Sequence, residues 1–284
     1  MEPDPCFQLP AKPGKTNDGG LRTRGFYKAE GSEPIVTVIT IAYNCASSIE
    51  ETMLSVLDQT YSNIEYIVID GGSVDGTLDV IKNYDHAIDY WVSEPDRGIY
   101  DAMNKGMRAS TGQWLNFMNV KDVFVGNKTI QILVDKYLRG KARFIYSDVL
   151  LRHGPFGKAK VARHVCNHEK LIIHHQGSIY QKSLHLEYGP YIVAKGMTIS
   201  DYLFFSLIDQ NNYLKSEDPI ALFDMTGISS AKASARQKYI IDYLMNGMPM
   251  YECLMRFQLL YCPEKIEKIL VWAVRLSRKA RGRT

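Results

Sequence analysis

Four apolar segments of the sequence each end in amide or carboxylate side chains, which are groups that bind nucleotides, phosphates and metal ions. The least ordinary of these ends is "MNVKDVF" (118–124), where Asn, Lys and Asp stand together after the segment "GQWLNF". Asn44, Asp70 and the pair of Glu94 and Asp96 follow the other three segments. If the segments are parallel strands of one sheet, their carboxyl ends share a crevice that can bind one polar ligand.

The segment "VIDGGSVDGT" places Asp70 before a predicted tight turn. Gly71 and Gly72 permit the backbone to approach a ligand closely, and Asp70 could accept a hydrogen bond from a base or a ribose. Ser73 or Asp75 could instead cap the helix that follows. That interpretation accounts for Ser73 and Asp75 and leaves Asp70 without a role.

The segment "SEPDRGIYDAMNKG" (93–106) gathers charged and amide side chains around a glycine and a short predicted helix. Asp96, Asp101, Asn104 and Lys105 in this arrangement suit a polar ligand that carries phosphate. A solvated helix face has the same residue types, so the segment by itself leaves both interpretations open.

The elements that must position these residues alternate between two patterns. Short β-branched or aromatic runs predict buried strands at 35–43, 64–70, 88–94 and 112–119. Helical patterns lie between them at 47–59, 74–84 and 99–110. Such alternation implies parallel strands joined by right-handed crossovers, which is an α/β fold.

The rest of the chain divides less regularly. Strands of a mixed or antiparallel section are predicted at 142–151, 158–165 and 174–181, and a helix at 199–210. We expect this half to frame an acceptor pocket. Residues 1–33 predict a loosely ordered lead-in in which "GLRTRGFYK" could pack locally, and the chain is predicted to be helical from about Ala233.

Composition sets broad bounds on the class of protein. The chain has 284 residues and 45% apolar content, enough for one large α/β domain with a smaller appendage. A net charge of +3 gives no indication of nucleic-acid binding. Five cysteines without a CxxC pair favour reduced thiols, and neither a signal peptide nor a membrane span is recognisable. We therefore expect a cytoplasmic enzyme.

The C-terminal segment 264–284 combines an apolar band, which includes Trp272, with a basic end that includes Arg275 and Arg283. Such a helix can lie on the anionic inner face of a membrane as a peripheral contact. It can equally dock its apolar stripe on the domain and leave its basic end in solvent.

Five segments taken together resemble glycosyltransferase family two, the inverting group with the GT-A fold: "VTVITIAYN", "SVLDQTY", "IEYIVIDGGSVDGT", "SEPDRGIYDAMNKG" and "WLNFMNVKD". Their order and spacing look most like the bacterial enzymes of capsule, O-antigen and exopolysaccharide assembly. The resemblance implies a Rossmann-like, mostly parallel central sheet flanked by helices. It divides the chain into a nucleotide-sugar half (34–125), an acceptor half (126–229) and a helical, basic extension (230–284).

This resemblance implies a nucleotide-sugar donor, UDP-linked, and a hydroxyl acceptor on a glycan or lipid-linked intermediate. Asp70 would contact the uracil, and the rest of the nucleotide would be bound by Thr40, Ala42, Asn44, Asp96, Asp101, Asn104 and Lys105. Asn119 and Asp122 would occupy the family's motif for diphosphate and metal, either Mn²⁺ or Mg²⁺.

Lys121 stands where the family motif has glycine or aspartate. A cation beside a divalent metal is repelled unless its long stem turns the ammonium away. The lysine could instead sit against the diphosphate and neutralise the leaving group as a point charge.

The resemblance places a general base at Asp201 in "KGMTISDYLFFSL", at the start of a predicted helix. An inverting transfer needs one carboxylate to take the proton of the acceptor hydroxyl. By itself Asp201 could merely cap that helix. His175 and Gln176 in "IIHHQGSIYQ" match residues that the family places near the acceptor or the diphosphate, and a packed, hydrogen-bonded histidine is the alternative.

Three other functions compete with this interpretation. His164, Cys166 and His168 alternate along one segment and could present zinc ligands, although no fourth ligand is evident. A nucleotidyltransferase would carry a Gly-rich basic loop after the first strand, and "AYNCASS" is not such a loop. A nucleotide-binding scaffold without catalysis is favoured only by Lys121.

Overall fold

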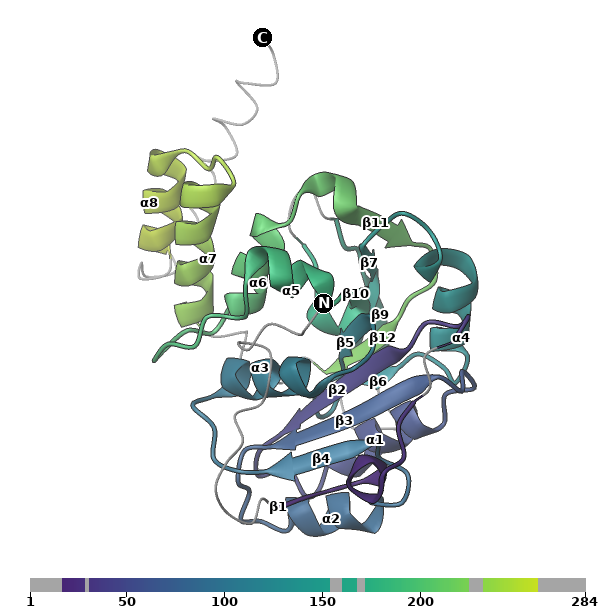
Figure 1. Ribbon diagram of the computed structural model, residues 1–284. Coiled ribbons are helices and arrows are strands. Elements are labelled where there is room, and N and C mark those ends of the chain that lie inside the picture. The colour runs from purple at the N-terminus through teal and green to yellow at the C-terminus, as the bar shows by residue number, and fades with distance from the viewer. Residues whose placement is uncertain (1–16, 29–30, 154–159, 168–171, 225–231, 260–284) are drawn as a thin grey trace.

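The computed structural model describes residues 17–28, 31–153, 160–167, 172–224 and 232–259. Figure 1 shows a large twisted sheet with helices on both faces, and a hairpin of two helices, α7 (Lys232–Met245) and α8 (Met250–Leu259), set to one side. The fold is therefore α/β, as the alternation of strands and helices predicted.

The larger sheet contains eight strands in the order β1-β4-β3-β2-β5-β10-β7-β11. The strands β4, β3, β2 and β5 are parallel, whereas β1 and β10 are antiparallel to their neighbours and β11 is parallel to β7. Asp70 pairs with both Ala42 and Ser93, so the carboxyl ends of three strands lie level. The bounds are β1 Asn17–Gly19, β2 Val36–Ala42, β3 Ile64–Asp70, β4 Tyr90–Ser93, β5 Trp114–Phe117, β7 Phe144–Ser147, β10 Ser178–Gln181 and β11 Tyr213–Ser216.

Alternating side chains of the central strands build a separate hydrophobic core on each face of the sheet. Val38 and Val68 pack with α1 (Ile49–Leu57), α2 (Thr77–Asn83) and α4 (Thr129–Leu133), which a short π-helix (Val134–Leu138) extends. Ile39 and Ile69 pack with α3 (Ile99–Ala109), α5 (Ser183–Tyr188) and α6 (Ser200–Leu207). Gly106 allows α3 to lie close to β2, because a Cβ there would come within 2.4 Å of Ile39 Cγ2.

A smaller sheet of four strands begins after the turn that follows β5. Its order is β6-β12-β8-β9, with β8 parallel to β12 and the other pairs antiparallel. The bounds are β6 Val123–Phe124, β8 Val149–His153, β9 Lys160–His164 and β12 Ala221–Asp224. Three 3₁₀ turns complete the described structure: η2 Leu21–Arg24, η4 His175–Gly177 and η5 Gln210–Asn212.

The four predicted parallel strands and the three helices between them are confirmed. The predicted strand 142–151 is instead two strands, β7 and β8, which lie in different sheets. The start of the predicted strand 174–181 is the turn η4. Helix beyond Ala233 is confirmed up to residue 259, whereas the basic segment 264–284 lies outside the described residues. Along the described ranges, no helix combines the length and apolar character needed to cross a bilayer.

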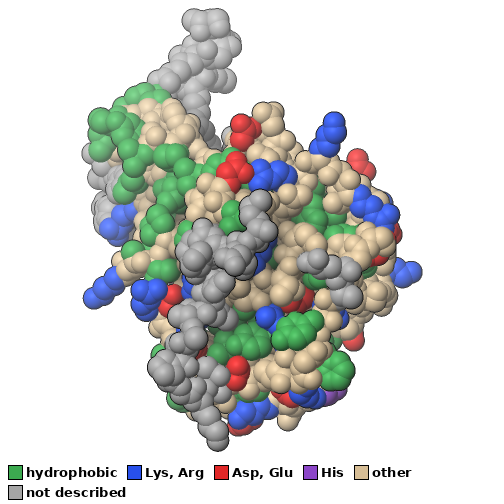
Figure 2. All heavy atoms as spheres, in the orientation of Figure 1, with side chains coloured by type: hydrophobic (Ala, Val, Ile, Leu, Met, Phe, Trp, Pro, Cys, Tyr) green, Lys and Arg blue, Asp and Glu red, His purple; other side chains and the backbone are tan. Residues whose placement is uncertain are grey.

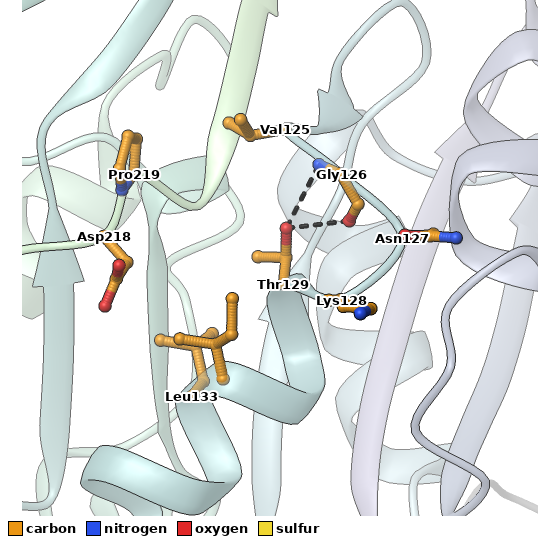
Figure 3. Close-up of a pocket in the computed structure, with 9 residues that line it drawn as sticks. Val125, Gly126, Asn127, Lys128, Thr129, Leu133, Asp218 and Pro219 are labelled. Atoms are coloured by element: carbon orange, nitrogen blue, oxygen red, sulfur yellow. Dashed lines mark hydrogen bonds between the residues drawn. The ribbon is translucent and has the colours of Figure 1, made fainter.

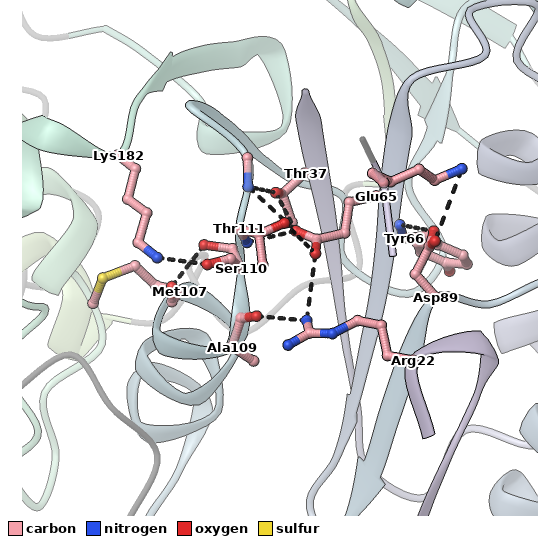
Figure 4. A network of polar contacts seen from close by, with 12 residues as sticks. Arg22, Thr37, Glu65, Tyr66, Asp89, Met107, Ala109, Ser110, Thr111 and Lys182 are labelled. Atoms are coloured by element: carbon pink, nitrogen blue, oxygen red, sulfur yellow. Dashed lines mark hydrogen bonds and ion pairs between the residues drawn. The ribbon is translucent and has the colours of Figure 1, made fainter. Parts of the chain in front are cut away.

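Local packing of "GLRTRGFYK" is confirmed, since residues 17–28 pair with the edge of the sheet and are held by buried polar contacts. The strand β1 pairs with β4, and Arg22 donates to Glu65 Oε1 (3.3 Å) and to the Ala109 carbonyl (2.7 Å). Figure 4 shows Glu65 at the centre of this network, where it also accepts from Thr37 Oγ1 and from the backbone N–H and hydroxyl of Thr111, each at 2.7 Å. The carboxylate of Glu65 thus joins the N-terminal segment to β2, β3 and the end of α3.

We expect Glu65→Ala to lower the free energy of unfolding by about 3 kcal/mol, because it leaves several buried donors without an acceptor. Urea unfolding followed by circular dichroism measures the change. Glu187→Ala is the matched control, since Glu187 pairs with Arg143 at the surface and should leave the unfolding midpoint nearly unchanged. Equal midpoints for the two variants would contradict the assigned role of Glu65.

Candidate active site

The ends of β2 and β3 are joined by a serine that the sequence suggested only as a helix cap. Asp70 is fully buried, and its carboxylate accepts from Ser73 Oγ (2.5 Å), the Ser73 N–H (3.0 Å) and Ser93 Oγ (2.6 Å). Ser73 Oγ also accepts from the Asn44 N–H (2.8 Å), and Asn44 Oδ1 accepts from the Val74 N–H (3.0 Å). Asp70 therefore fixes the backbone at these strand ends, with its oxygens already engaged by protein donors.

Two of the residues predicted to line the nucleoside lie in the interior. Thr40 is fully buried, and its hydroxyl donates to the Met118 carbonyl (2.9 Å) and accepts from the Tyr66 hydroxyl (3.0 Å). Ala42 is also buried, at the end of β2. The Thr40 hydroxyl is thus used to join β2 to β3 and β5, and it does not face a ligand.

The charged residues around α3 mostly hold the loop before the helix. Asp101 accepts from the Arg97 guanidinium (2.9 Å), and Lys105 Nζ binds the Pro95 carbonyl (2.9 Å) and Glu94 (3.0 Å). Asp96 Oδ1 accepts from the Gly98 N–H (2.8 Å). Asp96 is half-buried and Arg97 is 76% exposed, so these two residues remain accessible at the loop surface.

Asn104 joins α3 to the second half of the chain. Its side-chain amide accepts from the Tyr191 N–H (3.0 Å) and donates to the Tyr191 carbonyl (2.8 Å). Asn104 is 3% exposed, and both hydrogen bonds of its side chain go to the backbone of Tyr191. Its role is therefore structural, because it joins the two halves of the chain.

A continuous chain of hydrogen bonds connects the end of β5 to the start of α6. Asn119 Nδ2 lies 2.7 Å from His175 Nε2, and His175 Nδ1 lies 2.8 Å from Asp201 Oδ2. The Tyr100 hydroxyl donates to Asp201 Oδ1 at 2.7 Å. With the Asn119 amide donating, His175 Nε2 accepts and Nδ1 carries the proton that it gives to Asp201.

The carboxylate of Asp201 is held in its ionised form. Burial raises the pKa of Asp201, but the hydrogen bonds from His175 and from the Tyr100 hydroxyl outweigh it and bring the pKa below its usual value. Burial and then the neighbouring carboxylate raise the pKa of Tyr100, so that its hydroxyl keeps the proton it donates. The Asp201 side chain is 19% exposed, which leaves an ionised carboxylate open to a ligand.

Asp122 lies at the junction of the two sheets with both carboxylate oxygens in use. Oδ2 accepts from Gln176 Nε2 (2.7 Å) and Oδ1 accepts from the Asp224 N–H (2.9 Å). The side chain is 4% exposed, and burial raises its pKa to about 6, against the lowering effect of those two hydrogen bonds. Gln176 therefore orders Asp122, which in turn joins the turn after β5 to β12.

Lys121 occupies a backbone conformation that glycine prefers. Its φ is 79°, its N–H donates to Thr52 Oγ1 (3.0 Å), and its carbonyl accepts from Arg152 Nη2 (2.8 Å). Left-handed backbone is uncommon for a residue with a Cβ, and here the flanking contacts impose it. The turn has kept the shape that glycine gives it while carrying an exposed cation.

The residues at this turn do not by themselves form a divalent-cation site. Asp122 is 4% exposed and each of its oxygens faces a protein donor, and within the described ranges no three His, Cys, Asp or Glu side chains come together. Asn119 Oδ1 is buried without a hydrogen-bond partner and is the acceptor still available. The same finding gives no support to zinc at His164 and Cys166, and His168 lies outside the described residues.

A separate hollow near α4 holds none of the predicted site residues. Figure 3 shows this pocket of about 280 Å³ between the start of α4 and the loop before β12, with Thr129 bonded to the Gly126 backbone. Its lining includes Val125, Leu133 and Pro219, and we assign it no ligand.

Sequence reasoning missed Tyr100 and Ser93, although both lie in quoted segments. The signal available for Tyr100 was its place in the first turn of α3, shortly after the polar end of β4. Its partner Asp201 is 101 residues away, so no local pattern could connect them.

Comparison with known proteins gives one consistent result. The family model described as "Glycosyl transferase family 2" matches residues 37–193. An uncharacterised glycosyltransferase of Mycobacterium tuberculosis is 32% identical over 220 residues, covering 70% of this chain and 78% of the relative. A putative teichuronic acid biosynthesis glycosyltransferase of Bacillus subtilis is 35% identical over 99 residues, covering 34% of this chain and 39% of the relative.

Solved structures share the fold at low sequence identity. S. aureus TarS in complex with UDP-GlcNAc superposes with a TM-score of 0.60 at 16% identity, covering 78% of this chain and 70% of that chain. A mannosyltransferase of Pyrobaculum calidifontis in complex with GDP-Man and Mn²⁺ has a TM-score of 0.53 at 19% identity, covering 75% and 62%.

The raised pKa of Asp122 predicts a distinctive pH dependence of stability. A carboxyl with a folded pKa of about 6 binds its proton more tightly folded than unfolded, so its contribution to stability falls as pH rises from about 4 to about 6. Asp122→Asn removes this dependence. The stability of the variant relative to the native chain should therefore improve by up to about 3 kcal/mol between these pH values.

Urea unfolding across this pH range measures the difference, with Asp79→Asn on the exposed side of α2 as the control. A difference between native and Asp122→Asn that stays constant with pH would show that Asp122 is ionised in the folded chain throughout.

Proposed function

The chain belongs to glycosyl transferase family 2 and has the GT-A fold, and from this premise we propose that it transfers a hexosyl or N-acetylhexosaminyl group from a UDP-sugar to a hydroxyl, with inversion. The observation that carries the proposal is the ionised, partly open carboxylate of Asp201 beside the polar strand ends. The family catalyses sugar transfer, and this carboxylate is a base of the kind that an inverting transfer needs.

The donor is assigned to the crevice at the ends of β2, β3 and β4. Bound UDP-GlcNAc in TarS and GDP-Man in the mannosyltransferase support a nucleotide-sugar. We assign the nucleoside to the strand ends at Asn44 and Asp70 and to the accessible loop around Asp96, whereas Ala42 is buried and is not retained. Because the Asp70 oxygens are engaged, contact with uracil would come through the Ser73 and Ser93 hydroxyls that Asp70 orients. Thr40 is not retained in this site.

Asp201 acts as general base in the proposed reaction. Each carboxylate oxygen already accepts one hydrogen bond, from Tyr100 or His175, and keeps a second lone pair for the acceptor hydroxyl. The hydroxyl gives its proton to Asp201 as its oxygen attacks the anomeric carbon. The bond from that carbon to the diphosphate breaks on the opposite face, which inverts the configuration and releases UDP. Tyr100 and His175 are positioning residues that fix the direction of the carboxylate.

The charge that develops on departing UDP is assigned to protein groups. Asn119 lies at the end of the hydrogen-bond chain to Asp201, and Lys121 follows it on the rigid turn. A compact ammonium suits a diphosphate as a point charge. The requirement for Mn²⁺ or Mg²⁺ stays a prediction, and because Asp122 is buried against protein donors no step is assigned to a metal ion.

The acceptor is proposed to be a glycan or lipid-linked intermediate of cell-surface polysaccharide assembly at the cytoplasmic membrane. The resemblance of the motifs to capsule and O-antigen enzymes and the teichuronic acid relative support this class. The second half of the chain supplies Asp201, His175 and Gln176, which supports an acceptor site on that side.

We expect Asp201→Asn to lower sugar transfer or donor hydrolysis by about 10²- to 10⁴-fold, because the isosteric amide cannot take the proton. UDP affinity should change by less than about threefold, since the base does not bind the nucleotide. Turnover of UDP-glucose and UDP-GlcNAc and calorimetric binding of UDP measure the two quantities, with Asp79→Asn as the control.

Full turnover by Asp201→Asn would place the base elsewhere. UDP binding without turnover by the native chain on any donor would favour a nucleotide-binding scaffold over an enzyme.

A further inference from the structure

The tip of the α7–α8 hairpin exposes a compact group of large apolar side chains. We call it the hairpin patch, and it consists of Tyr243, Leu244, Met245, Met250, Tyr251 and Leu254. Leu244 is 67% exposed and Leu254 57%. Figure 2 shows hydrophobic side chains gathered over the hairpin at the upper left of the molecule. Patches of this kind on a soluble surface usually mark an interaction site.

The patch is not needed for attaching the hairpin to the domain. That attachment uses a different face, where the Tyr202 hydroxyl donates to buried Asp242, and Thr198 Oγ1 lies 2.9 Å from Ser234 Oγ. Ile241 and Cys253 are buried on the inner side of the hairpin. The outer apolar side chains are therefore available to a partner without disturbing the fold.

The patch can leave water without desolvating a charge. Residues 243–251 contain no Lys, Arg, Asp or Glu. The charges that flank them are already paired: buried Asp242 with Lys238 (3.3 Å), and Glu252 with Arg256 (2.8 Å). Tyr243 and Tyr251 add amphipathic rings of the kind that favour the boundary between lipid and water.

The charge of the following segment distinguishes between a lipid surface and a second copy of the chain. Residues 264–284 contain seven Lys and Arg against two Glu. Association of two copies joins two chains that each carry this excess of positive charge, which is unfavourable, whereas anionic lipid attracts each of them. The sequence and the patch thus point to the same partner.

We propose that the hairpin patch docks on the surface of an anionic phospholipid bilayer. Since Asp242 and Ser234 tie the hairpin to α6 and the residues just before it, docking also sets the orientation of α6, which carries Asp201. This second consequence rests on the proposed function: the acceptor side of the crevice is held near a lipid-linked substrate. The docking itself does not depend on catalysis.

Co-sedimentation of the full chain with vesicles tests the proposal. The native chain should pellet with phosphatidylcholine vesicles that contain about one-third phosphatidylglycerol and should stay in solution with phosphatidylcholine alone. Leu244→Ser combined with Leu254→Ser should lower the partition coefficient at least about tenfold, because two large apolar side chains no longer enter lipid. Met245→Gln with Met250→Gln is a second pair that should act in the same direction.

The matched control is Leu186→Ser with Ile192→Ser, two exposed apolar positions away from the hairpin, which should bind as the native chain does. Equal unfolding midpoints establish that each variant is folded. The proposal is overturned if the native chain does not co-sediment with anionic vesicles, or if both double variants of the hairpin patch bind the vesicles as the native chain does. It is equally overturned if light scattering shows a dimer that the hairpin variants dissociate. The vesicle experiment contains no nucleotide-sugar, so its result does not depend on whether the chain transfers sugar.

Discussion

The hydrogen bonds of the buried Asp122 carboxylate hold together the two halves on which the site depends. One oxygen binds Gln176, next to the histidine that contacts Asp201, and the other binds the backbone of β12. The backbone carbonyl of Asp122 accepts from Thr52 of α1 at 2.9 Å. Burial of this carboxylate raises its pKa to about 6, which shows that burying the charge is unfavourable. The junction is stable because the donors to Asp122 are fixed by α1, η4 and β12.

This junction gives a physical account of how the turn after β5 accommodates Lys121. Thr52, Arg152 and Asp122 together impose left-handed backbone at Lys121, so a lysine can stand where glycine would be easiest. The acid that the motif suggests as a metal ligand is used as a connector. Asp201, at the start of α6, keeps an ionised and partly open carboxylate.

The parallel core was predictable because its strands are continuous β-branched runs, with β3 correct to the residue at Ile64–Asp70. The level strand ends followed from that topology. The roles of individual polar residues did not follow, because they depend on partners far along the chain: Asp122 binds donors 54 and 102 residues away. Thr40 and Asn104 were assigned to the ligand because sequence shows a polar type without its partner. The strand β1 was missed because its three residues, Asn17–Gly19, are too few and too polar to show a periodicity. The segment is held instead by the contact between Arg22 and Glu65.

The measurement that tests the central claim most directly is calorimetric binding of UDP in EDTA, in Mg²⁺ and in Mn²⁺, to the native chain and to Lys121→Gly. Glycine suits the backbone at this position, so the substitution removes the ammonium without straining the turn. A donor site of the proposed kind binds UDP in EDTA and loses at least about tenfold in affinity in Lys121→Gly. Binding that needs metal and is indifferent to Lys121 would contradict the assignment of the diphosphate charge, and no binding of UDP under any condition would contradict the donor site itself.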